Sequence, residues 1–164
     1  MIQRIGTRQA RLPEDLEFLQ LVYASTREED LRLLGWSTDD AAGQSFVEMQ
    51  FAAQTSHYAR VWASACPMVI LVDGQAAGRF ITDRSGERIH IVDLSLLPRY
   101  RGAGAGGTLV RRLLRDADAS ALPVTCDVVI GNDAQGFWEH LGFRVRTVES
   151  AYMAMERPCE TSPG

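Results

Sequence analysis

The chain has 164 residues, of which 46% are hydrophobic and 23% charged, a composition typical of one globular domain. Its formal net charge of −4 disfavours a nucleic-acid-binding protein that relies on a basic surface. The sequence contains no run of about 18 apolar residues, so no membrane span is predicted. The N-terminal segment is polar and lacks the apolar core of a signal peptide. We therefore expect a cytoplasmic protein.

The first third of the chain predicts one strand and two helices. Residues 2–10 can form the strand. Pro13 predicts the start of a helix that runs to about residue 26, because proline fits the first helical turn. The segment at 27–36 is less regular, acidic and leucine-rich, and could form a helical turn of its own. A second helix is expected after it, from about residue 40 to 58.

The middle of the chain changes to a β-rich pattern, which predicts an antiparallel meander. The turn signals Asp73-Gly74 and Ser85-Gly86 separate its runs. The three runs span residues 68–72, 78–83 and 88–96.

The last part of the chain predicts two helices and three strands. One helix is expected after the glycine-rich stretch, ending at about Asp118. A second, shorter helix is expected between Asn132, a cap residue, and Gly142, a C-terminal glycine. The strands are expected at residues 124–130, 143–148 and 152–156. The element order predicts an α/β domain over residues 1–157, with a mixed, mostly antiparallel sheet of about seven strands flanked by about four helices. Residues 158–164 are expected to form a flexible tail.

A glycine-rich turn between the third run and the following helix carries the clearest chemical signal. After Arg101, it reads Gly102, Ala103, Gly104, Ala105, Gly106 and Gly107. Glycines let successive backbone N–H groups point into one concavity, and the helix N-terminus adds a positive dipole. The pattern therefore favours a phosphate or diphosphate ligand, to which Arg101 could add a charged contact.

Three other interpretations of this turn are weaker. A Walker loop is excluded because the chain has no lysine. A dinucleotide fingerprint matches at Gly102, Gly104 and Gly107, with Asp127 twenty residues further on, but three antiparallel strands precede it and too little chain follows. A plain tight turn would not need so many glycines.

Two motifs resemble those of the GNAT superfamily of N-acetyltransferases. The first is Arg101-Gly102-Ala103-Gly104-Ala105-Gly106, which fits the acetyl-CoA loop pattern Arg/Gln-x-x-Gly-x-Gly/Ala. The second runs from Asn132 through Phe137-Trp138 to Leu141-Gly142-Phe143 and resembles the Asn…Ala…Phe-Tyr…Leu-Gly-Phe helix. The predicted element order fits this family across residues 2–157.

The resemblance implies how acetyl-CoA would bind. The fourth strand would part from the fifth, with pantetheine in the gap. The implied cofactor-binding residues are Leu94, Ser95, Leu96, Arg101, Gly102, Ala103, Gly104, Ala105, Gly106, Gly107, Asn132 and Trp138. No metal is expected.

The catalytic candidates follow from the proton that the amine must lose. His90 lies where many members carry a Glu or His base, and it could equally be a polar residue at a strand start. Asp93 lies in an apolar run, so it is either a base or a carboxylate bonded to a helix end or an arginine. Trp138 stands where many members have a tyrosine acid, and an indole cannot act as an acid. Tyr152 could supply a phenol or simply pack.

The resemblance predicts an acetyl-CoA-dependent N-acetyltransferase that acts on a primary amine of a small molecule or peptide by direct attack. The second helix could supply a polar wall of the acceptor pocket through Gln50, Gln54, His57 and Tyr58. The alternative is a non-catalytic acyl-CoA-binding sensor or assembly module, which Trp138 favours. No nucleic-acid or membrane partner is expected, and homodimerisation is suggested by analogy with the family alone.

Overall fold

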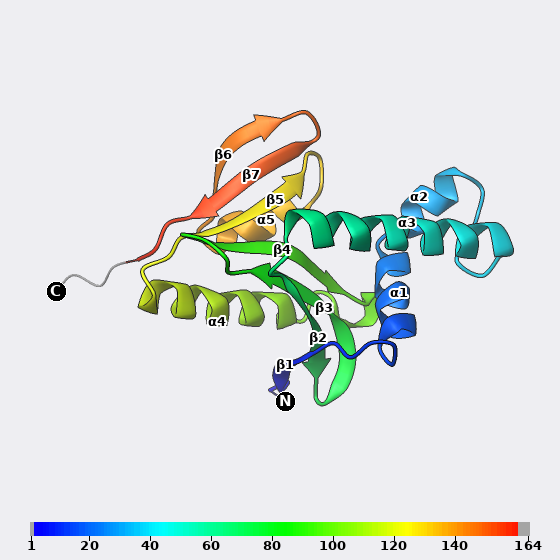
Figure 1. Ribbon diagram of the computed structural model, residues 1–164, viewed down its shortest axis with the longest axis horizontal. Helices are drawn as coiled ribbons and strands as arrows, with labels where there is room; N and C mark the ends of the chain where they lie inside the picture. Colours follow the sequence, from blue (N-terminus) through cyan, green and yellow to red (C-terminus); the bar gives the residue numbers. More distant parts are fainter. Residues whose placement is uncertain (1, 161–164) are drawn as a thin grey trace.

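Seven strands form one sheet in the order β1-β2-β3-β4-β5-β7-β6 (Figure 1). The structure is a computed structural model that describes residues 2–160. All neighbouring strands are antiparallel except β4 and β5, which are parallel. The strands are β1 Ile5–Gln9, β2 Cys66–Val72, β3 Gln75–Asp83, β4 Ile89–Leu96, β5 Val124–Val129, β6 Arg144–Glu149 and β7 Tyr152–Arg157.

Helices cover both faces of this sheet (Figure 1). The described part of the chain has five α-helices and one short 3₁₀ turn, η1 Pro98–Tyr100. The α-helices are α1 Leu16–Ser25, α2 Glu28–Leu33, α3 Ala41–Val61, α4 Ala105–Ala119 and α5 Ala134–His140. None of them combines the length and apolarity needed to cross a membrane.

The predicted fold class is confirmed, with differences at the helix ends. Helix α1 begins at Leu16, not near Pro13, because the Asp15 carboxylate accepts hydrogen bonds from the Arg8 guanidinium and the Arg11 N–H instead of capping a helix. The helical turn that the irregular segment could form is present as the short helix α2, and α3 extends beyond its expected end to Val61. Of the predicted tail, residues 161–164 lie outside the described residues, and the Glu160 N–H donates to Asp118.

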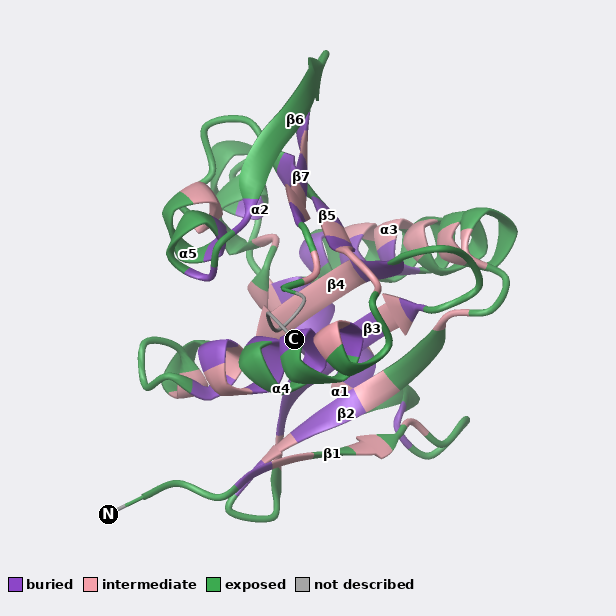
Figure 2. Ribbon diagram, turned by 90° about the vertical axis from the view of Figure 1, so that its left-hand side faces the viewer, coloured by how far each residue is buried: buried purple, intermediate pink, exposed green. Residues whose placement is uncertain are grey.

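The hydrophobic core lies mainly between the sheet and the helices α4 and α5. The buried stripe of α4 includes Leu109, Val110, Leu113 and Leu114, which pack on alternate residues of the strands. A smaller cluster joins α1, α2 and α3. Strand β6 is exposed along its whole length, as its green colour in Figure 2 shows.

The middle strand β4 contains a β-bulge at Val92. Its register with β3 pairs Asp93 with Ile81 and Ile91 with Thr82, so Val92 has no partner opposite it. A bulge adds one residue to one strand, and this reverses the face on which later side chains lie. His90 and Asp93 therefore face the same side, toward α3, while Ile91 and Leu94 face α4.

Candidate active site

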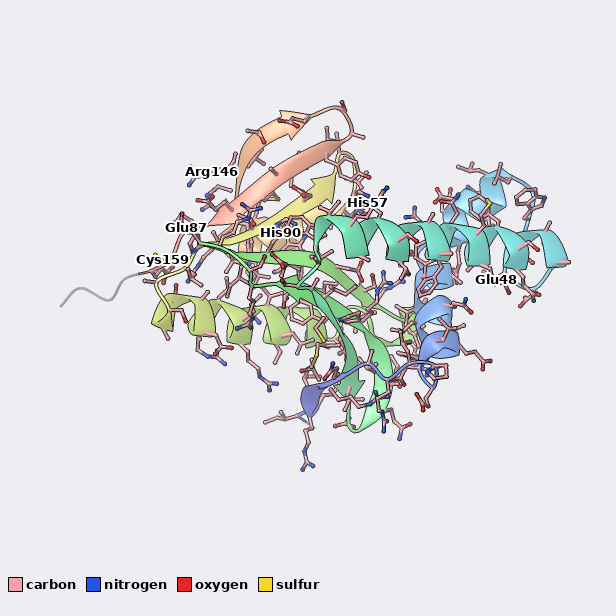
Figure 3. The ribbon with its side chains drawn as sticks, in the orientation of Figure 1. Glu48, His57, Glu87, His90, Arg146 and Cys159 are labelled. Atoms are coloured by element: carbon pink, nitrogen blue, oxygen red, sulfur yellow. The ribbon has the colours of Figure 1, made fainter. Side chains whose placement is uncertain are left out.

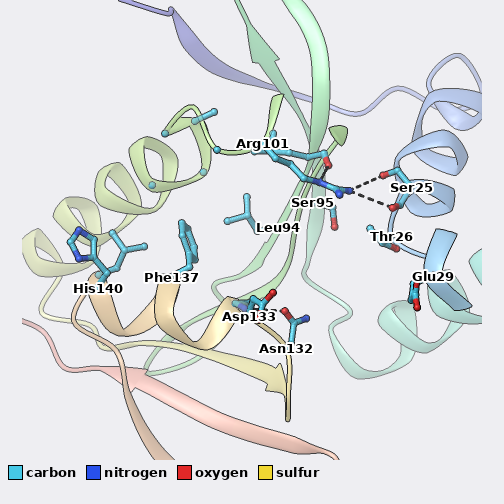
Figure 4. Close-up of a pocket in the computed structure, with 18 of the residues that line it drawn as sticks. Ser25, Thr26, Glu29, Leu94, Ser95, Arg101, Asn132, Asp133, Phe137 and His140 are labelled. Carbon is cyan, nitrogen blue, oxygen red and sulfur yellow. Dashed lines mark hydrogen bonds between the residues drawn. The ribbon is translucent and has the colours of Figure 1, made fainter. Parts of the chain in front are cut away.

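A V-shaped opening between β4 and β5 leads into a large cavity. The two strands pair only over three positions, from Ile89–Val124 to Ile91–Cys126, and then separate. The cavity that follows has a volume of about 1230 Å³ (Figure 4). It is lined by β4, by the glycine-rich turn with the start of α4, by the start of α5, and by the junction of α1 and α2.

The glycine-rich turn presents a row of free backbone donors to this cavity. Gly102 and Gly104 have φ values of +75° and +88°, which only glycine adopts readily, and a Cβ at either would meet no atom within 4 Å. The N–H groups of residues 102–107 donate no hydrogen bond within the described chain. Because α4 begins at Ala105, its positive N-terminal end adds to this concavity, which fits an anionic group such as a diphosphate.

Arg101 joins the two sides of the cavity mouth. Its Nε donates to the Leu96 carbonyl at 2.8 Å, and one Nη donates to the Ser25 hydroxyl at 3.2 Å (Figure 4). The guanidinium is therefore committed to the ends of β4 and α1. Arg101 therefore links the ends of β4 and α1, a structural role that the sequence pattern does not reveal. The sequence analysis expected only a contact with phosphate.

Helix α5 forms the opposite wall, and its two aromatic residues have different positions. Phe137 lines the cavity and lies 3.6 Å from the site where Gly106 would carry a Cβ. Trp138 does not line the cavity but is buried in the core, edge-on to Phe137 and Phe143. Asn132 lines the cavity, and its side-chain oxygen accepts the Ala134 N–H at 2.9 Å at the start of α5.

Asp93 is held by an ion pair on the α3 side of the sheet. Its Oδ2 accepts from Arg79 Nε at 2.8 Å, and the Ser95 hydroxyl donates to the same carboxylate. Arg79 is buried, and its second contact is Gln54 of α3 at 2.8 Å. These bonds occupy the carboxylate and fix it as the partner of Arg79. Tyr58 of α3 lies nearby, and burial with the adjacent Asp93 charge raises its pKa to about 12.

His90 lies on the same face, beneath the end of α3. Its Nδ1 is 2.8 Å from the Thr125 hydroxyl, and its Nε2 is 3.6 Å from the Asp127 carboxylate. The ring stacks on Trp62 with 4.2 Å between centroids. Burial lowers the pKa of His90, and the Asp127 carboxylate opposes this effect.

The cavity brings together most of the predicted cofactor-binding residues but not the catalytic candidates. Among the predicted binding residues, only Ala103 and Trp138 are absent from its lining. His90, Asp93 and Tyr152 do not line it, and Tyr152 is an exposed residue of β7.

The sequence analysis missed the wall formed by the α1–α2 junction, one residue of α4, and several residues on and beside α5. Arg111 could have been predicted from the sequence, because it lies one helical turn after Gly107 and therefore on the same face of α4. The α1–α2 junction carries no motif. The missed residues are Ser25, Thr26, Glu28, Glu29, Arg111, Gly131, Asp133, Ala134, Phe137, His140 and Leu141.

Comparison with solved structures shows the same fold in several acetyltransferases. The PaiA N-acetyltransferase from Thermoplasma acidophilum, in complex with coenzyme A, is 17% identical over 94% of this chain and 99% of its own, with a TM-score of 0.69. Ard1 from Thermoplasma volcanium is 20% identical over 95% of this chain and 98% of its own, with a TM-score of 0.64. The ribosomal-protein-S18-alanine N-acetyltransferase from Escherichia coli is 14% identical over 98% and 97% of the two chains, with a TM-score of 0.60.

The sequence itself gives the family. No curated protein matches the chain significantly. The model of the acetyltransferase (GNAT) family matches residues 23–143, which include α3, the strands β2 to β5, the glycine-rich turn and α5. The resemblance seen in the two sequence motifs is thereby confirmed. The chain belongs to the GNAT family of acetyltransferases.

Proposed function

We propose that this protein transfers the acetyl group of acetyl-CoA to a primary amine of a small molecule or peptide. The observation that carries the proposal is the row of unbonded N–H groups at residues 102–107, placed at the mouth of the split between β4 and β5. Membership of the acetyltransferase family and the coenzyme A in the PaiA complex support acetyl-CoA as the donor.

The donor fits the cavity in two ways. The turn offers backbone donors and a helix N-terminus to the diphosphate. Beyond Ile91, β4 has no partner strand on its β5 side, so the backbone edge near Leu94 and Ser95 is free for the pantetheine amides. The Leu96 carbonyl already accepts from Arg101, which limits this edge to the residues before it.

The acceptor would approach from the α3 side, where the polar side chains of β4 lie. A neutral amine attacks the thioester carbonyl, the C–N bond forms, and the C–S bond breaks. One proton must leave the nitrogen and one must reach the sulfur. His90 is better suited than Asp93 to accept that proton, because Arg79 and Ser95 occupy the Asp93 carboxylate. Trp138 is buried and supplies no acid, and thiols are acidic enough to leave without one.

Calorimetric titration with acetyl-CoA, with NADH as a parallel ligand, tests the donor site. Binding of acetyl-CoA alone is expected. A preference for NADH, or no binding of acetyl-CoA, would refute the proposal.

An amine panel with detection of released thiol then tests turnover. Cys66 is exposed, so we expect it to react with thiol reagents, and each rate is corrected with a reaction that lacks the amine. Transfer of a radiolabelled acetyl group from acetyl-CoA to the amine is a second way to measure turnover. The enzyme has no lysine, so none of its side chains carries an amine that could take up the label. Acetyl-CoA binding without thiol release across a broad panel would identify the alternative, an acyl-CoA-binding module.

A further inference from the structure

Of the described residues that line the cavity, two are arginines, and they differ in how they are bonded to the protein. The Arg101 Nε donates to the Leu96 carbonyl at 2.8 Å, and one Nη lies 3.2 Å from the Ser25 hydroxyl. A guanidinium bonded in this way to the ends of β4 and α1 has fewer N–H groups left for a ligand. Arg111 of α4, the other arginine, is the freer cation.

Helix α4 carries three arginines, and blue-tipped side chains project from it in Figure 3, where it is yellow-green. Arg112 donates to the Ile5 carbonyl of β1 at 2.7 Å. Arg111 makes neither a hydrogen bond nor an ion pair with any residue that the structure describes. The positions three and four residues away, which a helical side chain can reach, hold no acid: they are Gly107, Thr108, Leu114 and Arg115.

The guanidinium of Arg111 folds back onto the start of α4. A helical side chain leans toward the N-terminus of its helix, so Arg111 covers the turn before it. Its Nη1 lies 3.1 Å, and its Cζ 3.7 Å, from the point where Gly107 would carry a Cβ. Gly107 lies in the first turn of α4 and ends the row of free N–H groups at residues 102–107. The charge of Arg111 therefore lies beside that row.

The charges at this end of α4 have the same sign. The N-terminal end of a helix is positive, and an acidic residue in the first turn would oppose it, but α4 has none there. Arg111 adds a full positive charge, and Arg115 repels it from one turn further along. The acids that line the cavity stand on other walls and form no ion pair with Arg111: they are Glu28, Glu29 and Asp133. A bound anion would relieve this repulsion.

We propose that the Arg111 guanidinium, seated over Gly107, is the charged group that binds the diphosphate of acetyl-CoA. This inference rests on the proposed acetyl transfer, because it concerns the same donor. The backbone N–H groups of residues 102–107 bind the diphosphate from the turn, and Arg111 binds it from α4. Arg101 holds the ends of β4 and α1 together and so keeps the turn in place.

Gly107 makes room for this arginine. The acetyl-CoA loop pattern ends at Gly106, so the pattern does not explain a glycine at position 107. The backbone there is helical, and unlike Gly104 it does not have a positive φ. The three atoms nearest to an added Cβ all belong to Arg111: Nη1, Cζ and Nη2. A large side chain at position 107 would therefore displace the guanidinium from the turn.

Calorimetric titration with CoA tests the role of Arg111, with Arg115→Gln as the matched control. Arg115 is exposed and does not line the cavity, so its glutamine variant removes the same charge from the same helix without touching the site. Arg111→Gln should raise the Kd by about 10–100-fold, because a hydrogen bond between charged groups is lost. Arg115→Gln should change the Kd far less, because solvent screens its charge. Equal Kd values in the two variants would overturn the proposal.

Dephospho-CoA separates the diphosphate from the other phosphate of the ligand. It keeps the diphosphate and lacks the 3′-phosphate of CoA. We expect Arg111→Gln to weaken the binding of both ligands by the same factor. A loss that is seen with CoA and is absent with dephospho-CoA would assign Arg111 to the 3′-phosphate, and this would overturn its assignment to the diphosphate.

A double variant tests the role of Gly107. Leucine forms helices well, so Gly107→Leu is expected to fold. It should weaken CoA binding by displacing the guanidinium, and it should cause no further loss in a chain that already carries Arg111→Gln. A double variant that binds more weakly than both single variants would show that leucine blocks the cavity by itself, which would refute the role of Gly107.

Failure of this inference and failure of the proposed function give different results. If the function is wrong, the wild type does not bind acetyl-CoA or releases no thiol. If only the role of Arg111 is wrong, the wild type binds and turns over, and Arg111→Gln matches Arg115→Gln. Arg111 is exposed and bonded to no described residue, so its glutamine variant is expected to fold.

Discussion

Replacing Gly104 with glutamate would place a carboxylate in the concavity that the glycine-rich turn forms. Gly104 has a φ of +88°, so any residue with a Cβ is strained there by about 1–2 kcal/mol. In a chain of this size, 1 kcal/mol changes Tm by roughly 2–4 °C, so Gly104→Ala and Gly104→Glu should both melt about 2–8 °C lower. Only the glutamate adds a charge. Two like charges about 4 Å apart near a protein surface repel by up to about 4 kcal/mol, which is roughly a thousandfold in affinity.

Calorimetric titration of both variants with acetyl-CoA separates the two effects. Gly104→Ala carries the backbone strain without the charge, and no atom lies within 4 Å of its added Cβ. We expect it to bind far more tightly than Gly104→Glu. At about 1 M salt the Debye length falls to about 3 Å, so the difference between the two variants should shrink. Equal affinities in two folded variants would refute the assignment of this turn to the diphosphate.

Two further predictions concern stability, measured by urea unfolding. The Arg8 guanidinium and the Arg11 N–H hold the pKa of Asp15 well below its usual range. These contacts therefore stabilise the fold above about pH 4, and their contribution is lost as the pH falls toward the folded-state pKa. In Asp15→Asn the free energy of unfolding should depend less on pH, and an unchanged dependence between about pH 3 and 6 would contradict this. Arg79→Met should cost about 3–5 kcal/mol because it leaves the Asp93 charge unpaired, and the double variant with Asp93→Leu should regain most of that loss. A double variant no more stable than Arg79→Met would show that the ion pair is not the cause.

The glycine-rich turn could be predicted from the sequence because its geometry is local. Positive φ values at Gly102 and Gly104 follow from the residue type and from the strand and helix on either side. The closing glycine of α5, Gly142, was predictable for the same reason, and its φ is +93°. These positions depend on a few neighbouring residues and not on how the sheet is assembled.

The partner of Arg79 could not be found in this way. Nearby acidic residues such as Asp83 or Glu87 suggest themselves from sequence distance, but the structure pairs Arg79 with Asp93, fourteen residues away. That contact depends on the register between β3 and β4, including the bulge. Likewise, the choice between Phe137 and Trp138 as the cavity wall depends on the rotation of α5, which its seven residues do not specify by periodicity.

The bulge at Val92 gives β4 one residue more than the stretch of β3 that it pairs with. Removing this residue would restore simple alternation and leave Asp93 on the α3 side and Leu94 on the α4 side, because the residues that flank it keep their partners on β3. Val92 itself has no partner opposite it, so many side chains can stand there. Position 92 is thus tolerant of both substitution and deletion, whereas deleting Leu94 would turn Ser95 toward α4. A scan of both kinds of change along β4 would reveal this difference.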